Sequence, residues 1–263
     1  MSRSPTIHSR KYSPSKSSTW LNCPLSTLLN DGSSQETNPQ AEFGTQCHEL
    51  GAVLISKSLN LIDYDSEVKS VEDVIKELDM YSEEMQEIAD GYADFVIQTI
   101  EFEKKRTDTE PLIVIEQHLD MDFDDDAGGT LDCGIISSLD GGTLTVIDLK
   151  TGRTPVYAFD SESGLFNSQL GIYALYFYKA YKDLYPIKKV RLVIYQPVIN
   201  NTNEYEMTIE ELLQFESNVL IPAVKRTKVE NPEAHPGKYC RYCAGKAICK
   251  KRAEANKEVM YAL

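Results

Sequence analysis

The sequence lacks any apolar run close to the roughly 20 residues that a membrane-spanning helix needs. Its first residues are rich in Ser and basic side chains, and they lack the apolar stretch of a secretory signal peptide. The chain also has only one Trp, no internal repeat and no Pro/Gly-rich linker. We therefore expect a cytoplasmic protein without a membrane-spanning segment and with a single domain.

The composition is that of a globular protein, because 41% of the 263 residues are apolar and 26% are charged. The periodicity of apolar residues predicts an α/β fold with one helical region, a three-stranded antiparallel meander, a helix, a further strand and a last helix. The expected helices cover 41–61, 68–102, about 165–185 and 208–226, and the expected strands cover 111–121, 130–139, 143–150 and 189–198. Along residues 1–263 we expect an N-terminal segment to 40, a helical region to 110, a core to 200 and a C-terminal helix with a cysteine cluster.

Charge is distributed unevenly along the chain, although the formal net charge of -14 by itself argues against nucleic-acid binding. Residues 62–126 hold 22 acidic and 5 basic side chains, whereas residues 225–252 hold 9 basic side chains and two acidic ones. Residues 1–16 add four basic side chains and no acid. If the two ends meet, they form a positive surface on an acidic protein, although solvated charged faces explain the same counts.

The tripeptide Asp148-Leu149-Lys150 ends an apolar strand. Because side chains alternate along a strand, Asp148 and Lys150 project from one face and Leu149 from the other. Asp132 lies on the preceding strand, where a hairpin brings it beside Asp148. Two carboxylates that hold Mg²⁺ or Mn²⁺ and a lysine that orients water or stabilises charge suit phosphodiester cleavage.

Three further side chains belong to the same hypothesis. Gly44 to Glu49 is expected to open a helix, which places His48 near its first turn as a nitrogen ligand. Gln169 and Tyr173 are four residues apart, so they share one face of the next helix. Ordinary packing explains each of these alone.

The six cysteines are Cys23, Cys47, Cys133, Cys240, Cys243 and Cys249. A disulfide framework is not expected in a reducing compartment. The last three form a C-x₂-C-x₅-C cluster among Lys and Arg, and Cys23 is the natural fourth ligand because its neighbours look structured. Four thiolates suit either zinc or a [4Fe-4S] cluster. Cys47 and Cys133 are expected to pack in the core.

In order and spacing, the motifs resemble those of the RecB-type branch of the PD-(D/E)XK nuclease superfamily. The matching segments are GTxxH at 44–48, G-x-x-D at 129–132, VIDLKTG at 146–152 and QLxxY at 169–173. The resemblance implies a restriction-endonuclease-like core with helical additions, and a metal-dependent DNA exonuclease. It makes His48, Asp132, Asp148 and the main-chain carbonyl of Leu149 metal ligands, Lys150 the catalytic lysine, and Gln169 and Tyr173 supporting residues. Glu116 is a weaker candidate for an additional carboxylate. Asp148 stands where many relatives have Glu, and the shorter Asp side chain still coordinates metal.

The long separation of Cys23 from the C-terminal trio resembles the iron-sulfur staple of the AddB nuclease domain and of CRISPR-associated RecB-like exonucleases. That resemblance favours a [4Fe-4S] cluster over zinc and implies a clamped C-terminus. A resemblance to stand-alone RecB-like proteins further implies an enzyme of a phage, prophage or other mobile element, acting in a bacterial cell or phage-infected host. Since the phosphate-binding loop of a helicase is absent, such an enzyme acts alone, as a homo-oligomer, or with a helicase, recombinase or single-strand-binding partner.

Two alternatives remain at this stage. The first is a catalytically inactive iron-sulfur module that binds DNA in a recombination or CRISPR adaptation complex. Against it, Asp132, Asp148 and Lys150 are all present, and a binding module has no need of the three together. The second is a zinc-stabilised interaction protein without a nucleic-acid role.

Overall fold

The computed structural model of the chain describes residues 11–30, 38–60, 70–137 and 142–261. Its contacts divide the chain into two compact units. The first, here called the sheet unit, comprises Thr37–His118 and Thr130–Ile209. The second, the terminal unit, comprises Met1–Glu36, Leu119–Gly129 and Glu210–Leu263.

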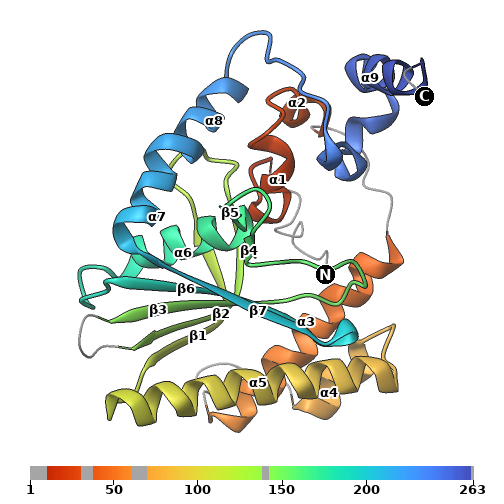
Figure 1. The fold of residues 1–263 in the computed structure, drawn as a ribbon. Coiled ribbons are helices and arrows are strands. Elements are labelled where there is room, and N and C mark those ends of the chain that lie inside the picture. Colours follow the sequence, from red (N-terminus) through yellow and green to blue (C-terminus); the bar gives the residue numbers. More distant parts are fainter. Residues whose placement is uncertain (1–10, 31–37, 61–69, 138–141, 262–263) are drawn as a thin grey trace. The chain divides into compact units, whose positions relative to one another are not determined.

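The sheet unit is built on a five-stranded sheet in the order β1-β2-β3-β6-β7 (Figure 1). The strands are β1 (Leu112–Asp120), β2 (Gly128–Ser137), β3 (Thr143–Leu149), β6 (Lys189–Gln196) and β7 (Asn201–Thr208). β2 pairs antiparallel with β3, β3 parallel with β6, and β6 antiparallel with β7. The predicted α/β architecture of three consecutive strands, a helix and a further strand is thus confirmed.

β7 was not predicted, because its sequence NTNEYEMT is almost wholly polar. It is an edge strand in which half-buried and exposed residues alternate, so few apolar residues mark it. The helix predicted from Thr208 does follow, in three consecutive segments: α7 (Ile209–Phe215), a π turn (Glu216–Leu220) and α8 (Ile221–Thr227).

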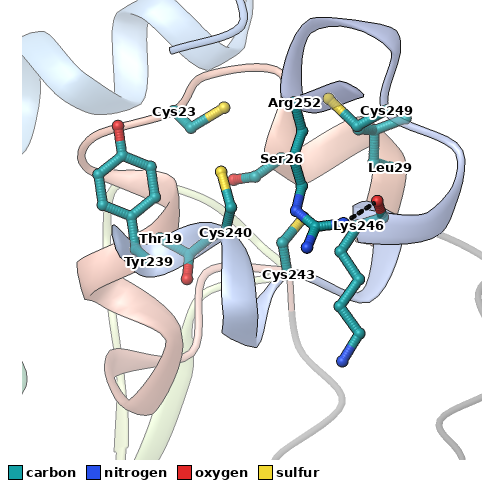
Figure 2. A pocket seen from close by; sticks show the side chains of 10 residues that line it. All are labelled: Thr19, Cys23, Ser26, Leu29, Tyr239, Cys240, Cys243, Lys246, Cys249 and Arg252. Atoms are coloured by element: carbon teal, nitrogen blue, oxygen red, sulfur yellow. Dashed lines mark hydrogen bonds between the residues drawn. The ribbon is translucent and has the colours of Figure 1, made fainter. Parts of the chain in front are cut away.

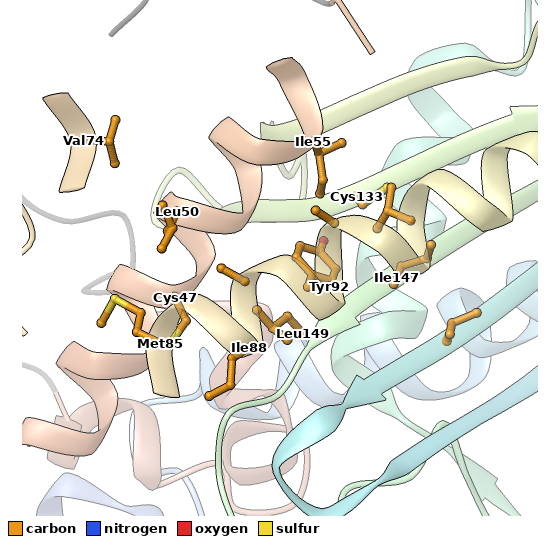
Figure 3. Packing of buried hydrophobic residues seen from close by; sticks show 14 of the residues in the cluster. Cys47, Leu50, Ile55, Val74, Met85, Ile88, Tyr92, Cys133, Ile147 and Leu149 are labelled. Atoms are coloured by element: carbon orange, nitrogen blue, oxygen red, sulfur yellow. The ribbon is translucent and has the colours of Figure 1, made fainter. Parts of the chain in front are cut away.

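Three helices pack with the hydrophobic core on one face of the sheet: α3 (Pro39–Ser58), α4 (Val71–Glu77) and α5 (Glu83–Thr107). Figure 3 shows Leu50, Met85 and Ile88 of these helices beside Ile147 and Leu149 of β3. The expectation that a helix opens at Gly44 is wrong. α3 begins at Pro39, where the Asn38 side chain accepts a hydrogen bond from the Gln40 N–H, so His48 lies well inside the helix.

α6 (Ser168–Tyr181) crosses between β3 and β6. It starts later than predicted, because β4 (Phe159–Asp160) and β5 (Leu165–Phe166) form a small hairpin before it. Asn167 caps the helix by accepting hydrogen bonds from two main-chain N–H groups. Gly134 of β2 lets α6 approach the sheet, since a Cβ there would lie 2.6 Å from Phe177.

The terminal unit contains α1 (Ser17–Trp20), α2 (Ser26–Asn30), α8 and α9 (Lys250–Tyr261), with two 3₁₀ turns at Lys238–Tyr242 and Ala244–Ala247. Pro24 lies between the two short helices α1 and α2. Trp20 is buried, and its indole N–H donates to the Ser13 carbonyl at 3.0 Å. Within the described residues, none of the helices combines the length and apolarity that a bilayer span requires.

Candidate active site and cysteine pocket

The ends of β2 and β3 bring the predicted carboxylates together. Cys133 pairs with Ile147, and the antiparallel register therefore sets Asp132 opposite Asp148. Asp148 is 2% exposed, and its Oδ2 lies 2.7 Å from Nζ of Lys150. Leu149 lies in the core on the opposite face, as predicted, and its N–H donates to Oδ2 of Asp132 at 2.9 Å.

His48 on α3 completes this group from a different element. Its Nδ1 lies 3.2 Å from Oδ2 of Asp132 and 3.9 Å from Oε1 of Glu116 on β1. The ligand atoms of these three residues all lie within 4.8 Å of one another, a spacing that could hold a metal ion. The structure therefore joins Glu116, the weaker candidate, to His48 and Asp132.

Gln169 connects the lysine to the carboxylate from the first turn of α6. Nζ of Lys150 donates to Oε1 of Gln169 at 3.0 Å, and Nε2 of Gln169 donates to Oδ1 of Asp148 at 2.8 Å. Tyr173, one turn later, is buried and hydrogen-bonded to Gln169. Gln169 and Tyr173 therefore belong to the hydrogen-bond network around Asp148 and Lys150, and their role is not hydrophobic packing alone.

The crowding of like charges perturbs the ionisation of the site. Burial by itself lowers the pKa of His48, but the carboxylate of Asp132 more than reverses this and raises it to about 9. Burial, with Asp132 next, raises the pKa of Glu116 to about 8. Burial also raises the pKa of Asp148, and Lys150 only partly opposes it. At neutral pH the metal-free site therefore holds protons on His48 and Glu116.

Glu116 has a backbone φ of 49°, in the left-handed region, although it lies within strand β1. A non-glycine residue in this region is uncommon, and such a conformation costs of order 1–3 kcal/mol. Strained residues of this kind are typical of functional sites, where the surrounding structure maintains them. The strain supports Glu116 as a working member of the group rather than a chance neighbour.

One feature of the site had no recognisable signal in the sequence. Tyr92 of α5 is 1% exposed, and its hydroxyl has no hydrogen-bond partner among the described residues. Burial raises the pKa of Tyr92, and the charges of Asp132 and Glu116 raise it further, so its side chain belongs to the surroundings of the site. Gly44, the first residue of the GTxxH motif, lies at a close contact, because a Cβ there would lie 3.0 Å from Oγ1 of Thr151, next to Lys150.

The four cysteines predicted as cluster ligands line one pocket of the terminal unit (Figure 2). Cys23 comes from the loop after α1, and Cys240, Cys243 and Cys249 come from the turns before α9. Two sulfur atoms accept main-chain hydrogen bonds, Cys23 from the N–H of His235 at 3.5 Å and Cys240 from that of Gly237 at 3.3 Å.

Lys246 and Arg252 line the same pocket, and the guanidinium of Arg252 points in among the cysteines while the ammonium of Lys246 points away from them (Figure 2). All six cysteines are free thiols, so the structure contains no disulfide among them. Cys47 and Cys133 are fully buried in the core of the sheet unit, as predicted (Figure 3). The sequence interpretation therefore separated the pocket cysteines from the core cysteines correctly.

Residues 8–262 match the family described as "Protein of unknown function (DUF2800)". The chain belongs to this family. The crystal structure of SSO0001 is similar at 16% identity and a TM-score of 0.30, covering 83% of this chain and 99% of that one. The crystal structure of a "putative exonuclease" from Eubacterium rectale is similar at 14% identity and a TM-score of 0.40, covering 92% and 93%. Both likenesses are distant, so the chemistry of this DUF2800 chain has to be read from its own residues.

The arrangement supplies the parts that hydrolysis of a charged ester requires. Carboxylates and an imidazole at one point suit a divalent cation. Lys150 lies beside that point with its ammonium fixed by two hydrogen-bonding neighbours, Asp148 and Gln169. Positioned positive charge next to a metal-ligand set stabilises charge that develops on a phosphate.

Proposed function

We propose that this chain is a metal-dependent deoxyribonuclease of the PD-(D/E)XK type that hydrolyses phosphodiester bonds at DNA ends. The observation that carries the proposal is the convergence of His48, Glu116 and Asp132 on one point. Asp148 lies opposite Asp132 on β3 and is paired with the ammonium of Lys150. The three converging residues come from α3, β1 and β2, and hydrophobic packing alone does not require ionisable groups from three elements to meet.

The residues fit a divalent metal ion. Oδ2 of Asp148 is buried and is paired with the ammonium of Lys150 at 2.7 Å. A carboxylate oxygen has two lone pairs, so a second one remains for a ligand. Burial and then the nearby Asp132 raise the pKa of Glu116, and the carboxylates, Asp132 first, raise that of His48; a cation would relieve this crowding of negative charge. His48, Asp132 and Asp148 would hold Mg²⁺ or Mn²⁺, with Glu116 and the carbonyl of Leu149 as further ligands. A bound ion lowers the pKa of a water molecule and neutralises phosphate charge.

The other side chains place the reacting groups. The Lys150 ammonium contacts a non-bridging phosphate oxygen or the attacking water, and it stabilises the charge that develops there. Gln169 fixes that ammonium through Oε1 and fixes the Asp148 carboxylate through Nε2, so that one amide sets their separation. Tyr173 holds Gln169 in turn.

We infer that Cys23, Cys240, Cys243 and Cys249 hold a [4Fe-4S] cluster with a structural role. Hydrogen bonds from main-chain N–H groups and the neighbouring guanidinium of Arg252 suit thiolates bound to iron. Among the described residues, no three cysteine sulfurs lie within 4.8 Å of one another. Four thiolates on one zinc ion lie about 3.8 Å apart, from a Zn–S distance near 2.3 Å. The wider spacing therefore favours a cluster over a single ion.

The DNA-binding surface that we propose lies on the terminal unit, around residues 225–252. Lys238, Arg241, Lys246, Lys250 and Lys251 are all exposed there. Burial lowers the pKa of Lys16, so this N-terminal lysine contributes less positive charge than an exposed one. Arg3 and Arg10 lie outside the described residues. The proposed roles in recombination, repair or phage DNA processing, with a helicase, recombinase or single-strand-binding partner, rest on the family resemblance alone.

The experiment follows end-labelled single-stranded and duplex DNA with Mn²⁺ or Mg²⁺, comparing the wild-type protein with Lys150→Ala. Lys182→Ala, an exposed lysine just beyond α6, is the matched control. We expect the wild type and the control to shorten DNA from its ends and Lys150→Ala to leave it intact. Wild-type protein loaded with its cluster that binds DNA without cutting it, with either metal, would instead support the inactive binding module.

A further inference from the structure

The segment between the catalytic lysine and α6 is long, exposed and yet tightly ordered. Residues 151–167 connect Lys150 to the first turn of α6, where Gln169 lies. Its second half forms the β4–β5 hairpin, and its first half has no regular secondary structure. We call residues 151–158, its first half, the exit loop.

Gln196, the last residue of β6, is fully buried, and its side chain forms hydrogen bonds with the backbone of the exit loop. Nε2 donates to the carbonyls of Gly152 at 2.6 Å and Thr154 at 2.9 Å. Oε1 accepts from the N–H of Val156 at 3.1 Å. A single amide therefore satisfies three main-chain groups of the exit loop and fixes its path.

Two asparagines on one face of β7 extend this clamp. Nδ2 of Asn201 and Nδ2 of Asn203 both donate to the carbonyl of Val156, at 2.9 and 3.1 Å. Oδ1 of Asn203 accepts from the N–H of Ala158 at 2.6 Å. Tyr205, the next residue on that face, stacks on Phe159 of β4 with ring centroids 4.5 Å apart. The unpredicted polar strand β7 thus has a definite task, which is to order the segment after Lys150.

The exit loop is also fixed at its two ends. Thr151 packs against α3 at Gly44, one helical turn before His48. Asn167 donates from Nδ2 to the carbonyl of Tyr157 at 3.2 Å, and its N–H donates to the carbonyl of Ala158 at 2.8 Å. The exit loop is therefore tied to β6, β7, α3 and the cap of α6.

In contrast to its fixed backbone, the exit loop presents two large side chains to solvent. The side chain of Arg153 is 77% exposed, and Tyr157 is 53% exposed. Arg153 lies 3.4 Å from Glu84 in an ion pair that is exposed on both sides, and such pairs contribute little. Arg153 therefore remains available to a stronger anionic partner.

We propose that the exit loop is a preorganised substrate-binding element, in which Arg153 contacts a phosphate and Tyr157 stacks on an unpaired base next to the scissile bond. This inference rests on the proposed nuclease function and adds its substrate contacts. Arg suits phosphate through its fixed fork of donors, and aromatic rings bind single strands by base stacking. Gln196, Asn201 and Asn203 are positioning residues, which spare the exit loop an ordering cost when DNA binds.

The first test uses a single-stranded oligonucleotide and the variants Arg153→Ala and Tyr157→Ala. We expect KM to rise roughly tenfold in each variant, the size of one lost base stack or charge-assisted contact, while kcat stays within about twofold. In binding measurements on the uncleaving Lys150→Ala background, Arg153→Ala should lower the slope of log K against log salt by about one. Lys182→Ala should change neither KM nor the salt slope.

The second test asks whether the clamp acts through the exit loop. Asn203→Ala removes the hydrogen bonds to Val156 and Ala158, and Thr202→Ala on the outward face of β7 is the matched control. We expect Asn203→Ala to raise KM, and Arg153→Ala to add less than about twofold in that background, because a disordered exit loop no longer presents Arg153. Additive effects of the two changes would overturn the positioning role.

These outcomes differ from those that test the nuclease itself. A wild-type protein that cleaves DNA, with Arg153→Ala and Tyr157→Ala at wild-type KM and salt slope, overturns the inference and leaves the proposed function standing. A wild-type protein that never cleaves DNA overturns the proposed function. The salt slope of the Arg153→Ala protein then still reports whether the exit loop contacts a phosphate.

Discussion

Binding of a divalent metal ion at the candidate site should release protons, and their number follows from the structure. With a pKa of about 9, His48 is about 99% protonated at pH 7, and Glu116 with a pKa of about 8 is about 90% protonated. Both groups must lose their proton to coordinate a cation. The side chain of Glu116 is 35% exposed, so solvent screening reduces its share. We expect between about 1.5 and 2 protons per Mn²⁺ ion.

The same values fix how metal affinity depends on pH. Between pH 7 and 8, deprotonation of His48 tightens binding by about tenfold and that of Glu116 by about fivefold, so Kd should fall by roughly fiftyfold. In Glu116→Gln the fall should shrink to about tenfold, and the proton release should drop to about one. Glu162→Gln changes an exposed carboxylate between β4 and β5 in the same way and should behave as the wild type.

Isothermal titration calorimetry in two buffers of different ionisation enthalpy measures the protons directly. The titration uses cluster-loaded protein with Mn²⁺ at pH 6.5, 7 and 8. A release below about half a proton, with a Kd that does not change with pH, would refute the placement of the metal at His48 and Glu116. It would do so whether or not the protein cleaves DNA.

Three further outcomes follow from other contacts. In melting experiments, metal-free protein should lose thermal stability as pH rises from about 5 to 9. The reason is that folding raises the pKa of Glu116 from 4.5 to about 8 and that of His48 from 6.5 to about 9, so the folded state binds these protons more tightly than the unfolded state. Saturating Mn²⁺ should reverse the loss. Cys240→Ser should lose iron and acid-labile sulfide in anaerobically prepared protein while Cys47→Ala keeps both, and zinc without sulfide in the wild type would exclude the cluster. Gly134→Ala should lower the free energy of unfolding in urea by about 1–3 kcal/mol, because its Cβ would lie 2.6 Å from Phe177. Gly152 has open space around it, so Gly152→Ala should leave that free energy nearly unchanged. Equal effects of the two substitutions would contradict the packing of α6 on β2.

The sequence predicted those parts of the molecule whose signal is local. Strand β3 is a run of apolar residues ending in Asp148 and Lys150, so both the strand and the facing of its side chains could be derived from alternation. The helical periodicity before it gave α3 and α5, and the grouping of Cys23 with the C-terminal trio was correct. The start of α3 was missed because Pro39 and its Asn38 cap precede the first apolar residues of the helix.

The features that escaped prediction depend on contacts between distant segments. β7 is polar because its inward side chains bind main-chain groups of the exit loop rather than a hydrophobic core, so no apolar alternation marks it. The left-handed backbone of Glu116 occurs within a β-branched, apolar strand pattern that predicts only extended residues. Tyr92 occupies an ordinary position on the buried face of α5, and only the sheet beneath it supplies the neighbouring carboxylates.

These unpredicted features explain how the site keeps its groups in place. Lys150 and Gln169 are brought into contact across a connection that would be mobile without partners, and the amides of Gln196 and Asn203 order its backbone. Glu116 reaches its position in the site with a strained, left-handed backbone. The Gly44–Thr151 contact brings α3 close to the end of β3. Catalysis by positioned charge requires groups fixed to within about half an ångström, and the contacts that would support such positioning come from the strand edge, the helix and the exit loop together.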